Sequence, residues 1–146
     1  MKVLLDSNVL IAYFDSNHVH HEPSTQLIEC CKDGDLLIAA HSLSEVYNKL
    51  TGGRIGPPFA PETISFILNA FARRVTVGSL TADLTMDAIR TFARQNGRGP
   101  KLYDYLIGQI AIVHGANCIV TWNVRDMAPL FPTLTVVTPA DFIGVA

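Results

Sequence analysis

Short apolar segments alternate along the chain with longer segments in which apolar residues recur at helical spacing. Five apolar runs of strand length are predicted to form β-strands: residues 2–5, 36–40, 75–77, 118–122 and 134–137. Helices are predicted between and after them, over residues 9–14, 24–32, 43–50, 61–73, 83–95, 101–114, 126–130 and 139–143. The segment RIGPPFAP, residues 54–61, is the strongest loop signal in the sequence.

Apolar strands that alternate with helices are typical of a parallel sheet whose two faces are covered by helices. The 146 residues are within the usual length of one domain and contain no internal repeat or linker. We therefore expect a single α/β domain over residues 1–146. Its expected architecture is a three-layer α/β/α arrangement around a mostly parallel sheet of about five strands.

Polar side chains follow the predicted strands or open the helices after them. Asp6 ends the first strand, Glu45 follows the second strand, and Asp104 lies in the first turn of the helix over residues 101–114. Asn123 and Asp126 follow the fourth strand. Because the carboxyl ends of parallel strands meet at one edge of a sheet, where ligand sites form, we expect these side chains to converge.

Each of these residues also has an ordinary structural explanation. Asp6 or Ser7 is suited to cap the following helix, and Ser42 with Glu45 fits the S-x-x-E capping box. Asp104 in a first helical turn is favoured by the helix dipole alone. The polar residues after the fourth strand are common in turns. Taken singly, no position decides between a structural and a functional role.

Convergence of several carboxylates needs a common explanation, because like charges without a nearby cation repel one another and destabilise a fold. A bound divalent cation would relieve that repulsion. The candidate ligands are oxygen atoms, and no paired Cys or His ligands accompany them. The chemistry of these ligands therefore favours Mg²⁺ or Mn²⁺ over zinc.

Composition limits the class of protein. Hydrophobic residues make up 49% of the sequence and charged residues 16%, which excludes a disordered chain, and the mean hydropathy of +0.27 makes self-association plausible. The net charge of −2 provides no overall basic field for nucleic acid, although a local patch would suffice. Three cysteines without metal-like spacing, no signal peptide and no membrane-spanning run predict a cytoplasmic protein with no membrane partner.

The sequence resembles the PIN-domain ribonucleases, and most closely the VapC-type toxins of toxin–antitoxin pairs. The resemblance covers nearly the whole chain. It is carried by four segments in order: VLLDSNVLIAYF, AAHSLSEVYNKLT, LYDYLIGQIAIVHGANCIVTWN and RDMAPLF.

The resemblance implies an endoribonuclease that depends on Mg²⁺ or Mn²⁺, is usually a homodimer, and is held inactive by a cognate antitoxin protein. Asp6, Glu45 and Asp104 match the three best-defined acids of the family. Asn123 stands where the family often has a fourth acid, and Asp126 is expected to supply that carboxylate. The implied catalytic set is therefore Asp6, Glu45, Asp104 and Asp126, and the implied metal ligands are Asp6, Asp104, Asn123 and Asp126.

Substrate contacts are less well defined by the sequence. Ser7 matches a small hydroxyl position that would bind metal or phosphate in the family. Four cations precede Asp104 and form a candidate phosphate track, although a solvated helix face explains them as well. These cations are Arg90, Arg94, Arg98 and Lys101.

Aromatic and histidine side chains provide further candidates. Tyr103 and Trp122 flank the expected site and would either stack on a base or pack against the protein. The segment HVHHE, residues 18–22, contains three histidines without the second ligand pair expected of a structural zinc site.

Two other functions compete with the ribonuclease interpretation. An Asp-dependent phosphatase also places an Asp after its first strand, but such enzymes generally need a second acid two residues later, where this chain has Asn8. The second alternative is a catalytically inactive PIN-like module that binds RNA or protein. The presence of Asp6, Glu45 and Asp104 argues against it, whereas Asn123 slightly favours it.

Overall fold

The computed structural model describes residues 1–53 and 56–145. Arg54 and Ile55, at the start of the predicted loop RIGPPFAP, lie outside the described residues. A five-stranded sheet runs through the molecule in the order β3-β2-β1-β4-β5, and every neighbouring pair of strands is parallel. The strands are β1 (Val3–Leu5), β2 (Leu36–Ala39), β3 (Thr76–Gly78), β4 (Cys118–Val120) and β5 (Thr135–Val137). The predicted fold class is confirmed.

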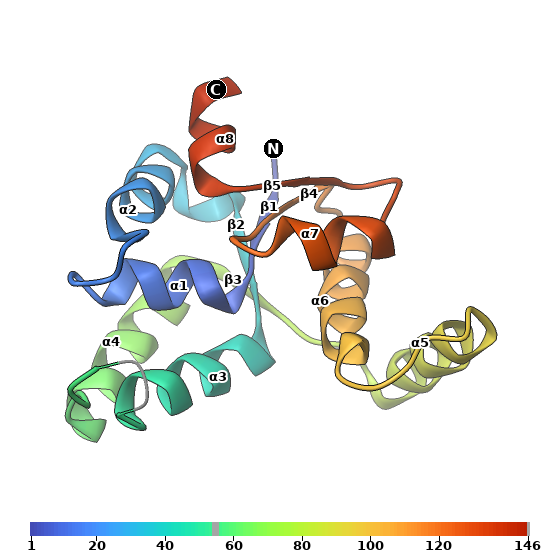
Figure 1. Cartoon of the computed structure of the whole chain (residues 1–146), viewed down its shortest axis with the longest axis horizontal. Coiled ribbons are helices and arrows are strands. Elements are labelled where there is room, and N and C mark those ends of the chain that lie inside the picture. Colours follow the sequence, from blue (N-terminus) through green and yellow to red (C-terminus); the bar gives the residue numbers. More distant parts are fainter. Residues whose placement is uncertain (54–55, 146) are drawn as a thin grey trace.

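Helices cover both faces of this sheet (Figure 1). The α-helices are α1 (Ser7–Phe14), α2 (His21–Cys30), α3 (Ala40–Thr51), α4 (Pro61–Arg74), α5 (Ala82–Arg94), α6 (Lys101–Val113), α7 (Val124–Met127) and α8 (Pro139–Val145). Two short 3-10 helices, η1 (Asp33–Asp35) and η2 (Ala128–Leu130), complete the described elements. Figure 1 shows α1 to α4 on one side of the strands and α6 on the other, with α5 at the periphery beyond α6. Among the described helices, none combines the length and apolar character needed to cross a membrane.

The strands are apolar throughout because both of their faces are buried. Successive side chains of a strand point to opposite faces. Val3 and Leu5 of β1 accordingly belong to the core beneath α1 to α4, whereas Leu4 belongs to the core beneath α5 and α6. All three are at most 1% exposed. This two-sided burial explains why the first strand reads as an uninterrupted apolar run.

Two helices begin three residues earlier than predicted. α3 starts at Ala40, directly after β2, so the predicted start at Leu43 is wrong. Ser42 is buried inside the helix and the N-cap position is Ala39, which makes no side-chain cap. The S-x-x-E capping box therefore does not form. α2 starts at His21 rather than Ser24, because a proline in the first turn of a helix is tolerated there.

The chain order of the strands reverses at β1, and we refer to the region between the loops after β1 and β4 as the crevice. Connections from β1 lead to β2 on one side, whereas β4 lies on the other side of β1. Such a reversal of strand order is where open α/β sheets bind ligands, because the loops after the two neighbouring strands diverge. Asp6 follows β1 and Thr121 follows β4 at this crevice.

Candidate active site

Asp6 is fixed at the end of β1 by hydrogen bonds to both of its carboxylate oxygens. It is the N-cap of α1, and Oδ1 accepts the backbone N–H of Ser7 at 2.8 Å. Oδ2 accepts the Thr121 hydroxyl at 2.8 Å and the Asn8 amide at 3.3 Å. The side chain is only 5% exposed, and this burial raises the pKa of Asp6 while the hydrogen bonds from Thr121 and Ser7 oppose the rise.

Thr121 and Asn8 complete a buried network with Asp6 that ties the end of β4 to the start of α1. The Thr121 hydroxyl accepts the Asn8 Nδ2–H at 3.1 Å and the backbone N–H of Asn123 at 3.0 Å. Asn8 Oδ1 accepts the backbone N–H of Trp122 at 3.0 Å. We call Asp6, Asn8 and Thr121 the strand-end network. It gives Asp6 one orientation.

The sequence prediction did not identify Thr121 or Asn8 as site residues. Thr121 was assigned to the interior of a strand over residues 118–122, but β4 ends at Val120. The available signal was a polar residue directly after an apolar strand, which is the same signal that identified Asp6. Thr121 is fully buried, so its hydroxyl needs the partners that the network supplies.

Glu45 lies in the second turn of α3, and its side chain is partly open to solvent. The Ser7 hydroxyl donates to Glu45 Oε2 at 3.5 Å, and His41 Nε2 lies 3.6 Å from Oε1. Burial raises the pKa of Glu45, His41 opposes that rise, and the charge of Asp6 adds to it. The Asp6 and Glu45 carboxylates are therefore close enough for their negative charges to repel each other.

Asp104 lies in the first turn of α6, as predicted. Partial burial raises its pKa to about 6, and the negative charges of Asp6, Asp126 and Glu45 add to the rise. Lys101, the first residue of the helix, opposes it. The charges of the other three predicted carboxylates thus all act on Asp104, and we call the four the acidic cluster: Asp6, Glu45, Asp104 and Asp126.

Asn123 and Asp126 form a pair at the start of α7. Asn123 Nδ2 donates to Asp126 Oδ2 at 3.0 Å, and both side chains are exposed. This contact holds the Asp126 carboxylate beside the Asn123 amide, whose carbonyl oxygen is a ligand type that Mg²⁺ and Mn²⁺ accept. The charge of Asp126 raises the pKa of Asp104, so the exposed Asn123–Asp126 pair lies on the solvent side of the acidic cluster.

The residues of the acidic cluster suit a hard divalent cation by their chemistry. Their donor atoms are oxygens, and the raised pKa of Asp104 arises partly from negative neighbours, so positive charge is stabilising there. Within residues 1–53 and 56–145, no three His, Cys, Asp or Glu side chains already lie in a metal-binding arrangement. Ligation would therefore require Asp104 and Asp126 to rotate toward Asp6, whose orientation the strand-end network fixes.

The predicted phosphate track is split by the structure. Lys101 is near enough to Asp104 to lower its pKa. Arg90 lies on the peripheral helix α5, where its Nη1 is 2.6 Å from Asp87 Oδ1. Arg98 Nη2 donates to Asn96 Oδ1 at 3.2 Å, and Arg94 is exposed at the end of α5.

The histidine segment and Trp122 pack against one another. The rings of His20 and Trp122 stack with centroids 3.9 Å apart, and Trp122 Nε1 donates to Ser24 Oγ at 2.9 Å. His21 Nδ1 lies 2.8 Å from the backbone oxygen of Ala12. Trp122 therefore joins the loop after β4 to α2, and His21 joins α2 to α1.

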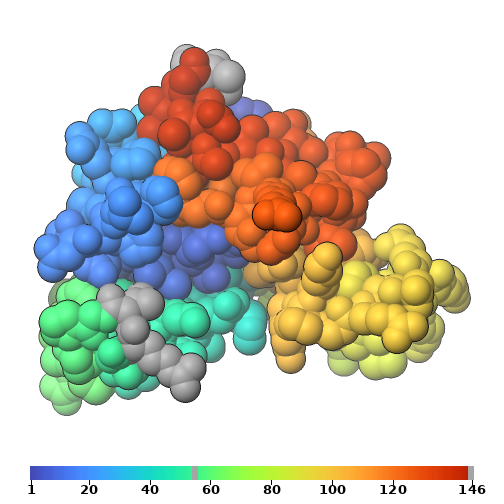
Figure 2. Space-filling model, viewed as in Figure 1, coloured from blue at the N-terminus to red at the C-terminus, as the bar shows by residue number. Residues whose placement is uncertain are grey.

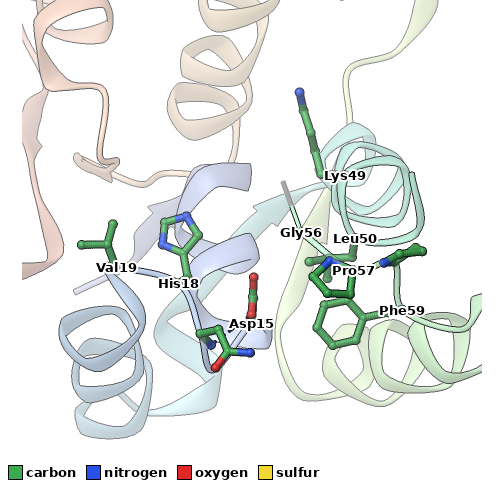
Figure 3. A pocket seen from close by; sticks show the side chains of 10 residues that line it. Asp15, His18, Val19, Lys49, Leu50, Gly56, Pro57 and Phe59 are labelled. Atoms are coloured by element: carbon green, nitrogen blue, oxygen red, sulfur yellow. Dashed lines mark hydrogen bonds between the residues drawn. The ribbon is translucent and has the colours of Figure 1, made fainter. Parts of the chain in front are cut away.

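Two cavities lie at opposite ends of α3. The larger, about 560 Å³, lies between the α1–α2 loop, the end of α3 and residues 56–59 (Figure 3). In Figure 3 Lys49 extends away from Leu50 and Phe59 on the wall of this cavity. The smaller, about 210 Å³, lies between the start of α3 and α6. Figure 2 shows the surface indented between α3 and the α5–α6 pair.

Comparison with solved structures finds the same fold in toxin–antitoxin proteins. The Mycobacterium tuberculosis toxin VapC20, described as cleaving the sarcin-ricin loop, aligns with a TM-score of 0.70 and 16% identity over 88% of this chain and 95% of VapC20. VapBC2 from Rickettsia felis, solved with promoter DNA, gives a TM-score of 0.63 and 17% identity over 93% of this chain and 97% of that one. A toxin–antitoxin complex from Klebsiella pneumoniae gives a TM-score of 0.65 and 20% identity over 94% of this chain and 98% of that one.

These identities are low, and the likeness therefore concerns the fold. A search of curated proteins gave no match. The PIN domain family, in contrast, matches residues 3–125 of the sequence. That range contains β1 to β4, the strand-end network and three of the four carboxylates of the acidic cluster. Because the match spans most of the chain, this protein belongs to the PIN domain family.

Proposed function

We propose that this protein is an endoribonuclease that hydrolyses RNA phosphodiester bonds at the acidic cluster with Mg²⁺ or Mn²⁺. The observation that carries the proposal is the electrostatic convergence of three other carboxylates on Asp104, whose pKa rises to about 6. A fold without a ligand gains nothing from such repulsion. Carboxylates at the crevice beside β1 are well placed for a ligand that carries positive charge.

Asp6, Asp104, Asn123 and Asp126 would hold the cation in this proposal. A bound Mg²⁺ or Mn²⁺ would polarise the scissile phosphate and lower the pKa of a water molecule. The strand-end network would keep Asp6 in one orientation during this chemistry. Glu45 is not among these ligands, and burial raises the pKa of its carboxyl, so it would be the proton acceptor beside them.

The proposal extends to a toxin that a cognate antitoxin controls, acting in the cytoplasm as a homodimer. Support comes from the structural neighbours from Rickettsia felis and Klebsiella pneumoniae, which are complexes of toxins with antitoxins. Exposed apolar side chains offer surface for such contacts, among them Ile112 and Val113 at the end of α6, which are 47% and 49% exposed.

The phosphatase alternative is disfavoured by the surroundings of Asp6. Asn8, at the position where such enzymes place a second acid, donates to Asp6 and to Thr121. Its role here is to orient Asp6.

Cleavage of a total RNA pool by the purified chain tests the proposal, with Mn²⁺, with Mg²⁺ and with chelator in parallel. Asp104→Asn protein from the same preparation is the control, since it keeps the shape of the side chain and removes its charge. We expect cutting that requires metal and is lost in the variant. Equal cutting by both proteins, or no cutting with either metal, would overturn the proposal.

A further inference from the structure

An apolar pocket of about 210 Å³ lies beside the acidic cluster, between the start of α3, the loop after β3 and α6. The wall and rim of the pocket are formed by Leu80, Leu106, Ile107, Ile110, His41 and Tyr103. Drug-sized ligands occupy sites of roughly 300–1,000 Å³, so this pocket fits a smaller, flat group. None of the sequence-predicted ligands or cations is among its described lining residues.

The rim of the pocket is built from direct neighbours of the acidic cluster. His41 Nε2 lies 3.6 Å from Glu45 Oε1, and Tyr103 immediately precedes Asp104. The His41 and Tyr103 rings are nearly parallel, with an interplanar angle of 12° and centroids 5.9 Å apart. Tyr103 is 56% exposed although it is a large aromatic residue. A group in this pocket therefore sits beside residues that directly adjoin two carboxylates.

We propose that this pocket binds one nucleobase of single-stranded RNA, adjacent to the phosphate that the acidic cluster cuts. The inference rests on the proposed function and deepens it. Single-stranded RNA is recognised through bases that stack on aromatic side chains, and Tyr103 and His41 offer such faces at the mouth of an apolar pocket. Ser79 and Thr85 also line the pocket. The Thr85 hydroxyl donates to the backbone oxygen of Thr81 at 2.8 Å and keeps its acceptor capacity for the polar edge of a base.

The proposal explains how a site made of carboxylates would prefer one RNA sequence over another. Contacts to phosphate position a nucleic acid but carry no sequence information, whereas contacts to bases do. The acidic cluster is suited to the phosphate alone. A pocket of the size of a base, at the edge of the cluster, would provide the contact that distinguishes one RNA sequence from another.

Binding of an oligouridine that carries a single 2-aminopurine tests the pocket without depending on cleavage. Stacking quenches 2-aminopurine fluorescence, and Asp104→Asn protein serves as a background that does not cut. We expect Tyr103→Ala to weaken binding about 5- to 100-fold and to abolish quenching, as for loss of one base–aromatic stack. Tyr103→Phe keeps the ring and should bind within about twofold of the parent, whereas Ser79→Phe should block the pocket with a new ring.

Phe66→Ala is the matched control, because Phe66 is also an exposed aromatic residue but lies on α4. Its binding should equal that of the parent. The same Tyr103 and Ser79 changes in the cutting-competent chain should alter the sequence preference of cleavage in an RNA pool, while their melting temperatures stay near the parent value.

Each outcome is decisive for the pocket. Unchanged binding, quenching and cleavage pattern in Tyr103→Ala and Ser79→Phe would overturn the inference, as expected if the pocket takes a protein side chain instead. In that case metal-dependent cutting would still support the proposed function. Absence of cutting by the parent together with quenching that depends on Tyr103 would overturn the nuclease proposal but support a base-binding pocket.

Discussion

Asp6 at the end of β1 and Asp104 in α6 are both carboxylates of the acidic cluster, but the protein surrounds them differently. Hydrogen bonds from Thr121 and Ser7 lower the pKa of Asp6 and partly offset the effect of burial. For Asp104, burial and three negative neighbours raise the pKa together, and Lys101 is the counteracting charge. Hydrogen bonds fix the orientation of Asp6, whereas neighbouring negative charges destabilise the ionised form of Asp104.

This difference shows that the end of β1 and the helices α3 and α6 contribute differently to the crevice. The strand end provides a rigid anchor, because β1 and β4 are parallel neighbours and the Asp6 N–H donates to Val120 oxygen at 3.0 Å. The helices α3 and α6 bring further charge to that anchor. A positive ligand is therefore expected to change the energetics of Asp104 more than the position of Asp6.

The largest expected effect is the loss of activity in Asp104→Asn. Replacement of an outer-shell partner of a metal ligand typically costs 10- to 100-fold, so loss of a ligand should reduce metal-dependent RNA cleavage by at least about 100-fold. The metal-free variant should melt at a higher temperature than the parent at about pH 7.5, because one repelling charge is gone. A variant that is inactive but less stable would break the comparison.

Thr121→Val should show the opposite stability effect. Valine keeps the shape of threonine but removes the hydroxyl that donates to Asp6 and accepts from Asn8 and Asn123. We expect a loss of about 1–3 kcal/mol in the free energy of unfolding and about a 10- to 100-fold loss of cleavage. Urea unfolding and cleavage assays measure the two. Thr121→Ser retains the hydroxyl and should behave like the parent.

The pH dependence separates the two carboxylates further. With a pKa of about 6, the ionised fraction of Asp104 falls about tenfold between pH 7 and pH 5, and metal-dependent cleavage should fall with it. The free energy of unfolding of the metal-free protein changes with pH in the opposite direction to the cleavage activity. A raised carboxyl pKa means that the native state holds the proton more tightly, so stability decreases as pH rises through about 6.

Melting temperatures of the parent and Asp104→Asn between about pH 4 and pH 8 measure this dependence. The advantage of the variant should grow as pH rises from about 4 to above 6 and then level off. A constant difference between the two proteins at every pH would show that the charge of Asp104 is not the cause.

The smallest expected effect is that of Ser42→Ala. The Ser42 Oγ atom is buried and has no hydrogen-bond partner within the described part of the chain, and a buried unsatisfied hydroxyl costs about 1–3 kcal/mol. Stability should stay equal or increase slightly in thermal unfolding. A loss of about 0.5–2 kcal/mol would instead support the helix-capping role of Ser42 that the S-x-x-E spacing suggested.

The sequence predicted the sheet and the four carboxylates because both depend on local pattern and strand order. Apolar runs at Val3–Leu5 and Cys118–Val120 reveal buried parallel strands, and a parallel sheet places the residues after its strands at one edge. Asp6 and Asp104 could therefore be placed near one another without a structure.

The strand-end network could not be predicted in the same way. Thr121 and Asn8 are 113 residues apart, and their contact depends on the register between β1 and β4, which the sequence pattern does not specify. The start of α3 was also missed, because a strand that passes directly into a helix leaves no turn signal at Ala40. The S-x-x-E spacing then suggested a boundary three residues late.

Diffraction from a crystal grown with Mn²⁺ tests the central claim most directly, because the anomalous signal of manganese locates the ion without reference to activity. The account predicts a peak in the crevice at the carboxyl ends of β1 and β4, bounded by Asp6 and Asp104, with the Asp104 side chain turned toward it. Saturating Mn²⁺ with no peak in this crevice, or with its peak at His18 to His21, would contradict the account.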